Sequence, residues 1–66
     1  MKYNFSDAII QLRVKLNVSQ TELAKLLGVS FSSINRWEKG KFAPTIIASE
    51  KLKVLFKENQ IELKEM

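Results

Sequence analysis

The sequence contains neither cysteine nor histidine, and these two absences exclude several kinds of chemistry. Without cysteine there are no disulfides, thiolate nucleophiles or cysteine-bound metals. Without histidine the protein lacks the side chain that most often acts as a general base or a transition-metal ligand. The sequence also has no glycine-rich phosphate loop and no pair of carboxylates at catalytic spacing. We therefore expect no enzyme, no metal site and no cofactor.

Long apolar runs are absent as well. No stretch approaches the roughly 20 residues that a membrane-spanning helix needs, and the first residues lack the apolar block of a signal peptide. We expect a cytoplasmic protein without a membrane contact. The 66 residues contain no repeat, linker or low-complexity stretch, so residues 1–66 are expected to form a single domain.

Positive charge is concentrated in the first two-thirds of the chain. The net charge is +4; residues 1–41 carry seven basic and three acidic side chains, and residues 42–66 carry four of each. Apolar residues make up 45% of the sequence, which is ordinary for a globular domain and argues against disorder. A basic surface of this kind favours an anionic partner such as a phosphate backbone.

Four segments show the apolar spacing of helices, and no window shows the alternation of a β-strand. The segments cover approximately residues 5–16, 19–28, 30–40 and 45–58. Their N-caps are expected at Asn4 or Ser6, and then at Ser19, Ser30 and Thr45. The expected core positions of the first and fourth segments are Phe5, Ala8, Ile9, Leu12, Leu16, Ala48, Leu52, Leu55 and Phe56. The fold class is therefore all-α.

The last eight residues, 59–66, alternate acidic, basic and aliphatic side chains. This pattern fits a fraying tail, a short fifth helix or a dimer contact, and the sequence does not choose among them.

The second and third segments are separated by about three residues, so they must cross steeply. Such a corner needs a small residue where the two backbones approach, a residue that tolerates positive φ in the turn, and an apolar residue that fills the corner from inside. Ala24, Gly28 and Val29 meet these needs in this order. The residues expected to face the common core are Leu23, Leu27, Ile34 and Trp37. This combination is typical of a helix-turn-helix.

The chain resembles the Cro and phage-repressor family of helix-turn-helix proteins, also called the Xre family. The resemblance covers roughly residues 5–56. The residues that carry it are Arg13, the stretch SQTELAKLLGVS from Ser19 to Ser30, the serines that follow, Ile34, Trp37, Glu38, Gly40 and Pro44. It implies a lambda-repressor-like bundle of four or five short helices. It also implies sequence-specific binding of double-stranded DNA, usually by a homodimer on a two-fold symmetric operator, with repression as the commoner mode of regulation.

A recognition helix presents the exposed residues of its N-terminal part to base edges. With Ile34 and Trp37 turned inward, the residues that face outward are Phe31, Ser32, Asn35, Arg36 and Lys39. The resemblance implies that four of them, Phe31, Ser32, Asn35 and Arg36, contact bases. Arg36 suits guanine, because a guanidinium can bond O6 and N7 together, and Asn35 suits adenine in the same way. Two roles remain open for Phe31, which either touches a thymine methyl group or folds back onto the protein.

Phosphate contacts are expected from the start of the second segment and from the loop after the third. The positive end of a helix dipole and free backbone N–H groups favour anions at the first place. The expected contacts are Ser19, Gln20, Thr21, Lys39 and Lys41. For Gln20 the resemblance also implies a place at the DNA backbone, and a contact with a base is left open. The resemblance gives Arg13 and Glu38 a different role, as an ion pair that joins the first and third helices, and we interpret Trp37 as a core residue.

Two other functions compete with DNA binding: an antitoxin-like role and RNA binding. An antitoxin-like protein would bind a partner protein as well as its own promoter, but only residues 59–66 are left to contact that partner. RNA binding is disfavoured because the aromatic residues are not arranged on a sheet for base stacking.

Overall fold

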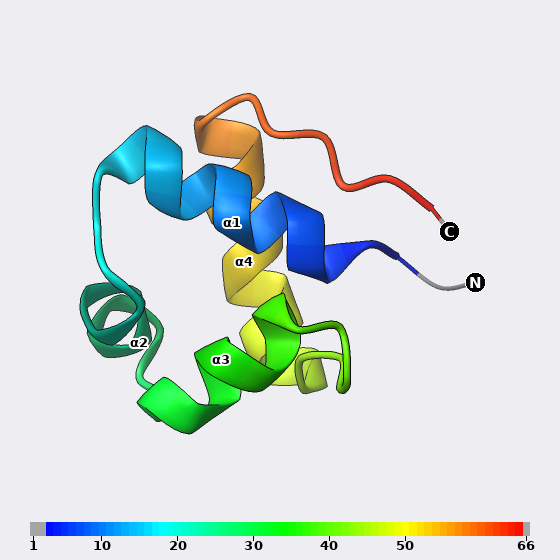
Figure 1. Cartoon of the computed structure of the whole chain (residues 1–66). Helices are drawn as coiled ribbons and strands as arrows, with labels where there is room; N and C mark the ends of the chain where they lie inside the picture. The colour runs from blue at the N-terminus through cyan, green and yellow to red at the C-terminus, as the bar shows by residue number, and fades with distance from the viewer. Residues whose placement is uncertain (1–2, 66) are drawn as a thin grey trace.

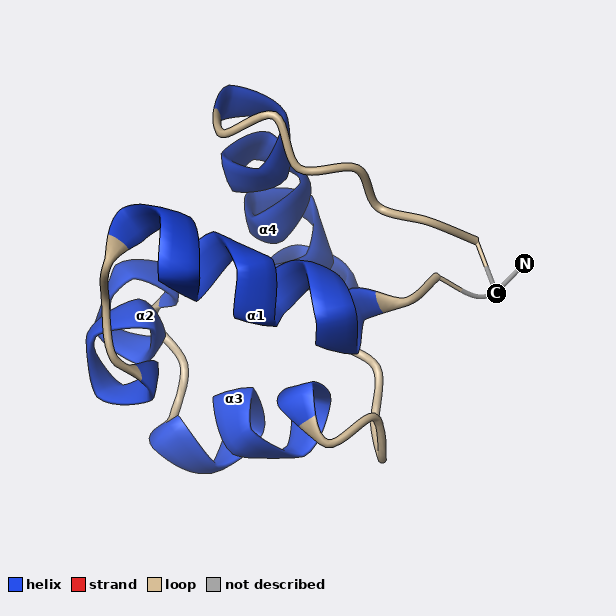
Figure 2. Cartoon of the chain, turned by 45° about the horizontal axis from the view of Figure 1, so that its top comes forward, coloured by secondary structure: helices blue, strands red, loops and turns tan. Residues whose placement is uncertain are grey.

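The computed structural model describes residues 3–65, which fold into four helices (Figure 1). The helices are α1 (Phe5–Leu16), α2 (Gln20–Leu27), α3 (Phe31–Glu38) and α4 (Ile46–Glu58). This described part of the chain contains no strand, so the predicted all-α fold is confirmed. α3 packs against α1 and α2, and α4 lies against the same two helices from the other side (Figure 2).

Each helix begins at a side chain that accepts a hydrogen bond from a backbone N–H in the first turn. The N-caps are Asn4, Ser19, Ser30 and Thr45. Of the two predicted caps for α1, it is therefore Asn4 that holds the position. At α2 the bonding is reciprocal, because Ser19 accepts from the N–H of Glu22 while Glu22 accepts from that of Ser19. These short polar contacts fix where each helix starts.

The corner between α2 and α3 has the predicted composition. Gly28 ends α2 in the left-handed conformation, with φ at 71°. The N–H of Val29 then bonds the carbonyl of Ala24 at 3.0 Å, which closes the turn. Ala24 is buried and Val29 is half-buried against the core. The three-residue connection therefore holds α3 at a steep angle to α2 (Figure 1).

The core is built from apolar side chains of all four helices. Its buried members are Ala8, Ile9, Leu12, Leu23, Ala24, Leu27, Ile34, Trp37, Ala48, Leu52, Phe56 and Ile61. Every buried residue in the described part of the chain is apolar. Leu55, predicted as a core residue, lies at the edge and is half-buried, and so are Phe5 and Leu16.

The segment after α4 is an extended tail that runs back beside the start of α1 (Figure 1). Gln60 has a positive φ of 58° and ends the helix, and Ile61 then enters the core. Further on, the N–H of Asn4 bonds the carbonyl of Lys64 at 2.8 Å, and Tyr3 pairs with Glu65 in an antiparallel bridge. Residues 59–65 contain no helix.

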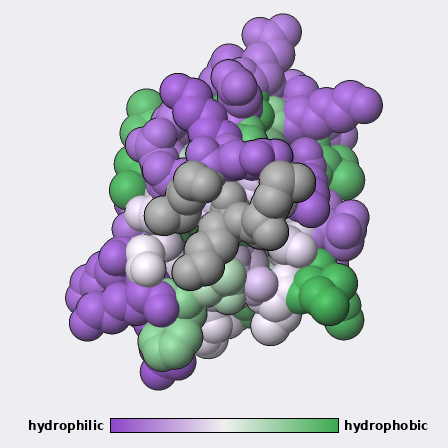
Figure 3. Space-filling view, turned by 90° about the vertical axis from the view of Figure 1, so that its right-hand side faces the viewer, coloured by the Kyte–Doolittle hydropathy of each residue, from purple (hydrophilic) through white to green (hydrophobic). Residues whose placement is uncertain are grey.

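The surface is mostly hydrophilic on the face near the chain ends, where hydrophobic side chains appear as separate patches toward the edges (Figure 3). Across the described residues, large apolar side chains are exposed on all four helices and in the loop before α4. No helix in this part of the chain has the length and apolar character to cross a membrane.

Candidate nucleic-acid interface

Helix α3 has one buried edge and one polar exposed edge. Ile34 and Trp37 are buried, so the opposite edge faces solvent. Of the residues predicted to contact bases, Ser32, Arg36 and Phe31 are exposed and Asn35 is half-buried. Phe31 is 50% exposed, so its ring does not fold into the core of the free protein. The edge is therefore available to an external partner along most of its length.

Arg36 has a neighbour that the sequence did not indicate. The Cζ atom of its guanidinium lies 5.6 Å from the centroid of the Phe42 ring, in a cation–π contact. The chain returns to Arg36 because Gly40 takes a φ of 75°, which allows the N–H of Lys41 to bond the carbonyl of Arg36 at 3.3 Å. The sequence offered one signal for this contact: Phe42 is an aromatic residue two positions after Gly40, the glycine that follows α3.

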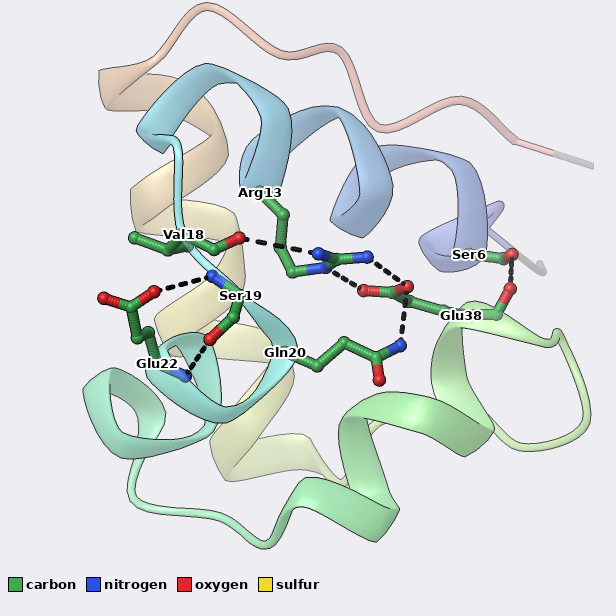
Figure 4. A network of polar contacts seen from close by, with 7 residues as sticks. All are labelled: Ser6, Arg13, Val18, Ser19, Gln20, Glu22 and Glu38. Atoms are coloured by element: carbon green, nitrogen blue, oxygen red, sulfur yellow. Dashed lines mark hydrogen bonds and ion pairs between the residues drawn. The ribbon is translucent and has the colours of Figure 1, made fainter.

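The carboxylate of Glu38 joins α3 to α1 through Arg13 (Figure 4). Arg13 donates from Nε to Oε2 at 2.6 Å and from Nη2 to Oε1 at 2.9 Å, so the contact is bidentate. The side chain of Glu38 is 8% exposed and that of Arg13 is 25% exposed. Arg13 also donates from Nη1 to the carbonyl of Val18, at 3.5 Å. The pair thus lies at the edge of the core and fixes how α1 and α3 meet.

Two further residues bind Glu38. Gln20 donates from Nε2 to Oε1 at 2.9 Å, and the hydroxyl of Ser6 donates to the backbone carbonyl (Figure 4). From the sequence, Ser6 was considered only as a possible N-cap, although it lies seven residues before Arg13 and hence on the same face of α1. Burial alone would raise the pKa of Glu38, but the hydrogen bonds from Arg13 and Gln20 and the charge of Arg13 lower it overall. The pKa of Arg13 is raised, mainly by its hydrogen bond to Glu38.

The start of α2 holds three residues predicted to contact phosphate, and the structure gives them different surroundings. Ser19 is exposed, and its hydroxyl oxygen accepts the hydrogen bond that caps the helix. Thr21 is exposed, whereas Gln20 is half-buried against Glu38. The bonds from the backbone and hydroxyl of Ser19 lower the pKa of Glu22, so its carboxylate stays ionised to a lower pH than that of an ordinary glutamate. The capping bonds involve only Ser19 and Glu22, so the side-chain donors of Gln20 and Thr21 take no part in them.

The loop after α3 carries the two remaining residues predicted to contact phosphate. Lys39 ends the helix and Lys41 follows Gly40, and both side chains are exposed. With Arg36 they form a basic group at one end of α3. Among the described residues, no cluster of acidic side chains could hold a metal ion. The exposed basic side chains at this end of α3 suit contact with an anion that lies along the surface of the protein.

A helix-turn-helix family model matches residues 9–56. The match begins within α1 and ends at Phe56, the last buried residue of α4. The chain belongs to the Xre-type helix-turn-helix family. In this helix-turn-helix protein the matched span includes Glu38 and its partners Arg13 and Gln20, whereas Ser6 lies before it. It also includes the whole exposed edge of α3.

The chain is also similar to a protein of Pyrococcus furiosus that is named as an HTH-type transcriptional regulatory protein. The two are 44% identical over 52 residues, which is 79% of this chain. The same alignment spans only 16% of the length of the relative, so the likeness is confined to a small part of it. No solved structure matches the chain.

Proposed function

We propose that this helix-turn-helix domain binds double-stranded DNA sequence-specifically and regulates transcription, with α3 in the major groove. The exposed edge of α3 is the observation that carries the proposal. Ile34 and Trp37 anchor the opposite edge in the core, which leaves side chains able to read bases directed outward. The name of the Pyrococcus furiosus relative supports a regulatory role. We propose repression as the mode of regulation, because a protein that occupies a promoter blocks it without contacting any other protein.

Base reading is assigned to Phe31, Ser32, Asn35 and Arg36. Arg36 donates two hydrogen bonds to guanine, and Asn35 and Ser32 bond neighbouring base edges. Phe31 contacts a thymine methyl group, a role supported by its exposure in the free protein. Asn35 is half-buried in the free protein, so part of its side chain is accessible.

Phosphate binding is assigned to the start of α2 and to the loop after α3. Ser19 and Thr21 lie at the positive end of the α2 dipole, where backbone N–H groups can bond phosphate oxygens. Gln20 has a second N–H beside the one that it gives to Glu38. Lys39 and Lys41 add two positive charges that attract phosphate regardless of sequence.

The test is selection of bound duplexes from random DNA, followed by fluorescence anisotropy on the selected and a scrambled duplex. Binding should weaken steeply with salt: roughly 4–6 neutralised phosphates per protomer give a log–log slope near −0.9 for each contact. A flat salt response, or equal affinity for both duplexes, would contradict the proposed function.

We further propose that two copies bind one operator, with half-sites about 34 Å apart. The contact surface lies on the later part of α4 and the tail, where Val54 is 57% exposed. Val54→Glu should abolish the dimer on DNA, whereas Val14→Glu, a 75% exposed valine on α1, should leave it intact. Sedimentation of a 1:1 complex on a palindromic duplex would refute the dimer.

A further inference from the structure

The contact between Arg36 and Phe42 has no role in holding the core together. Phe42 is 60% exposed and does not belong to the core or to the side chains packed against it. Its ring instead lies beside the guanidinium at the end of α3. An aromatic side chain that is exposed in this way and contacts a basic residue of the helix edge calls for an explanation other than folding.

The chemistry of the contact leaves Arg36 free to bind a partner. A cation–π contact uses the face of the aromatic ring and none of the five N–H donors of the guanidinium. Among the described residues, the Arg36 side chain forms no ion pair and no hydrogen bond. A long side chain without such a contact would sample many rotamers, and fixing it on binding would cost entropy. The ring reduces that freedom while the donors stay available.

We propose that Phe42 is a positioning residue, which holds the Arg36 guanidinium in the orientation needed to bond a single guanine. This inference rests on the proposed function, in which Arg36 reads a base. The turn at Gly40 is part of this arrangement, because the positive φ of Gly40 brings Phe42 back to α3. Space does not require glycine there, since a Cβ atom at Gly40 would meet nothing within 4 Å. The positive φ alone favours glycine at this position.

The experiment compares Phe42→Leu, which keeps an apolar side chain without a π face, with Phe42→Tyr, which keeps the ring. Leu26→Ala is the matched control, because Leu26 is 61% exposed and lies on α2, outside the proposed contacts. Each variant is measured on the selected duplex and on duplexes with the Arg36 base pair substituted. Phe42→Leu should reduce the preference for guanine about two- to fivefold at that pair only. Phe42→Tyr and Leu26→Ala should retain it.

Combining Phe42→Leu with Arg36→Ala separates positioning from direct contact with DNA. If Phe42 acts through Arg36, its substitution has no further effect once Arg36 is alanine. An undiminished loss in that background would overturn the inference, and so would tighter guanine binding by Phe42→Leu. If the wild-type protein showed no sequence preference at all, the proposed function itself would fail.

A measurement on the free protein gives an independent readout. The Nε–Hε resonance of Arg36 should carry a ring-current shift in the wild type and in Phe42→Tyr, and lose it in Phe42→Leu. The thermal midpoint should stay the same in all three, since Phe42 lies outside the core. An unshifted Arg36 resonance in the wild type would show that the ring does not hold the guanidinium in solution.

Discussion

Gln20, the first residue of α2, donates its side-chain amide to Glu38, the last residue of α3, with 2.9 Å between Nε2 and Oε1. The same carboxylate binds Arg13 of α1. One side chain therefore connects three helices on the side of the molecule where α2 and α3 would meet DNA. If the proposed function holds, substitutions at Glu38 should change both the stability of the protein and its affinity for DNA.

Removal of either member of the Arg13–Glu38 pair should destabilise the domain. Arg13→Met leaves the Glu38 carboxylate, which is 8% exposed, without its charged partner. We expect a loss of about 2–3 kcal/mol, less than the ~3–5 kcal/mol for a fully buried pair, because Arg13 is itself partly exposed. The measurement is urea unfolding of Arg13→Met, Glu38→Leu and the double variant. The double variant should cost less than the sum of the two, and additive losses would mean that the pair is not coupled.

The lowered pKa of Glu38 predicts how stability depends on pH. The ionised carboxylate contributes its full stabilisation above its ordinary pKa of 4.5, and that contribution is lost as the pH falls through the lower pKa of the folded protein. Glu22 acts in the same direction but is exposed, so its effect is smaller. Thermal melting should show a constant midpoint down to about pH 5 and a fall below it. Glu38→Gln should remove more of this fall than Glu22→Gln does.

Substitution of Gln20 should affect DNA binding on every sequence. Gln20→Met keeps the length of the side chain but removes both N–H donors, the one bonded to Glu38 and the one assigned to phosphate. We expect a loss of about 1 kcal/mol in affinity, equal on selected and scrambled duplexes. The comparison is made by anisotropy at one salt concentration. A loss confined to the selected duplex would instead make Gln20 a base contact.

Arg36 and Lys41 should behave differently, although both are exposed basic residues near the end of α3. Arg36→Ala should cost about 1–3 kcal/mol and relax the preference at one base pair. Lys41→Ala should weaken binding to all duplexes alike and reduce the salt slope by about one phosphate contact. Both variants are measured on the selected duplex and on its single-base variants. Identical effects on specific and random DNA would refute the separation of roles.

Gly28 should be sensitive to substitution for a conformational reason. A Cβ atom there would meet only the Nζ atom of Lys51, at 4.0 Å, so space is available. The φ of 71° nevertheless penalises an L side chain, and Gly28→Ala should cost about 1 kcal/mol in the free energy of unfolding. Gly28→Asn should cost less, because Asn17 already ends α1 with a φ of 57°. A larger loss for Gly28→Asn than for Gly28→Ala would instead indicate that crowding is responsible.

The helices were predictable because their signals are local. A capping serine or threonine and a left-handed glycine act within a few residues of one another, as at Ser19 and Gly28. The buried positions of α1, such as Ile9 and Leu12, follow from helical spacing alone. Family resemblance added the partnership of Arg13 and Glu38, whose 25-residue separation no local rule covers.

The features that were missed depend on packing between distant segments. Ile61 is buried because the tail turns at Gln60 and runs back along the molecule, a path that spacing within the tail does not encode. Leu55 remains half-buried because it lies at the edge of the core. Likewise, Phe42 meets Arg36 only through the bond that closes the turn at Lys41. Composition and periodicity do not predict such contacts between distant segments.

The pairing of Tyr3 with Glu65 brings two distant parts of the polypeptide within reach of one peptide linker. A polypeptide made of residues 3–65, with Glu65 joined to Tyr3 through a short linker, would form a closed ring around the same four helices. The unfolded ring would have fewer conformations than the open chain, so cyclisation should slow thermal inactivation. It would also protect the protein from exopeptidases, since no free end would remain for them to attack.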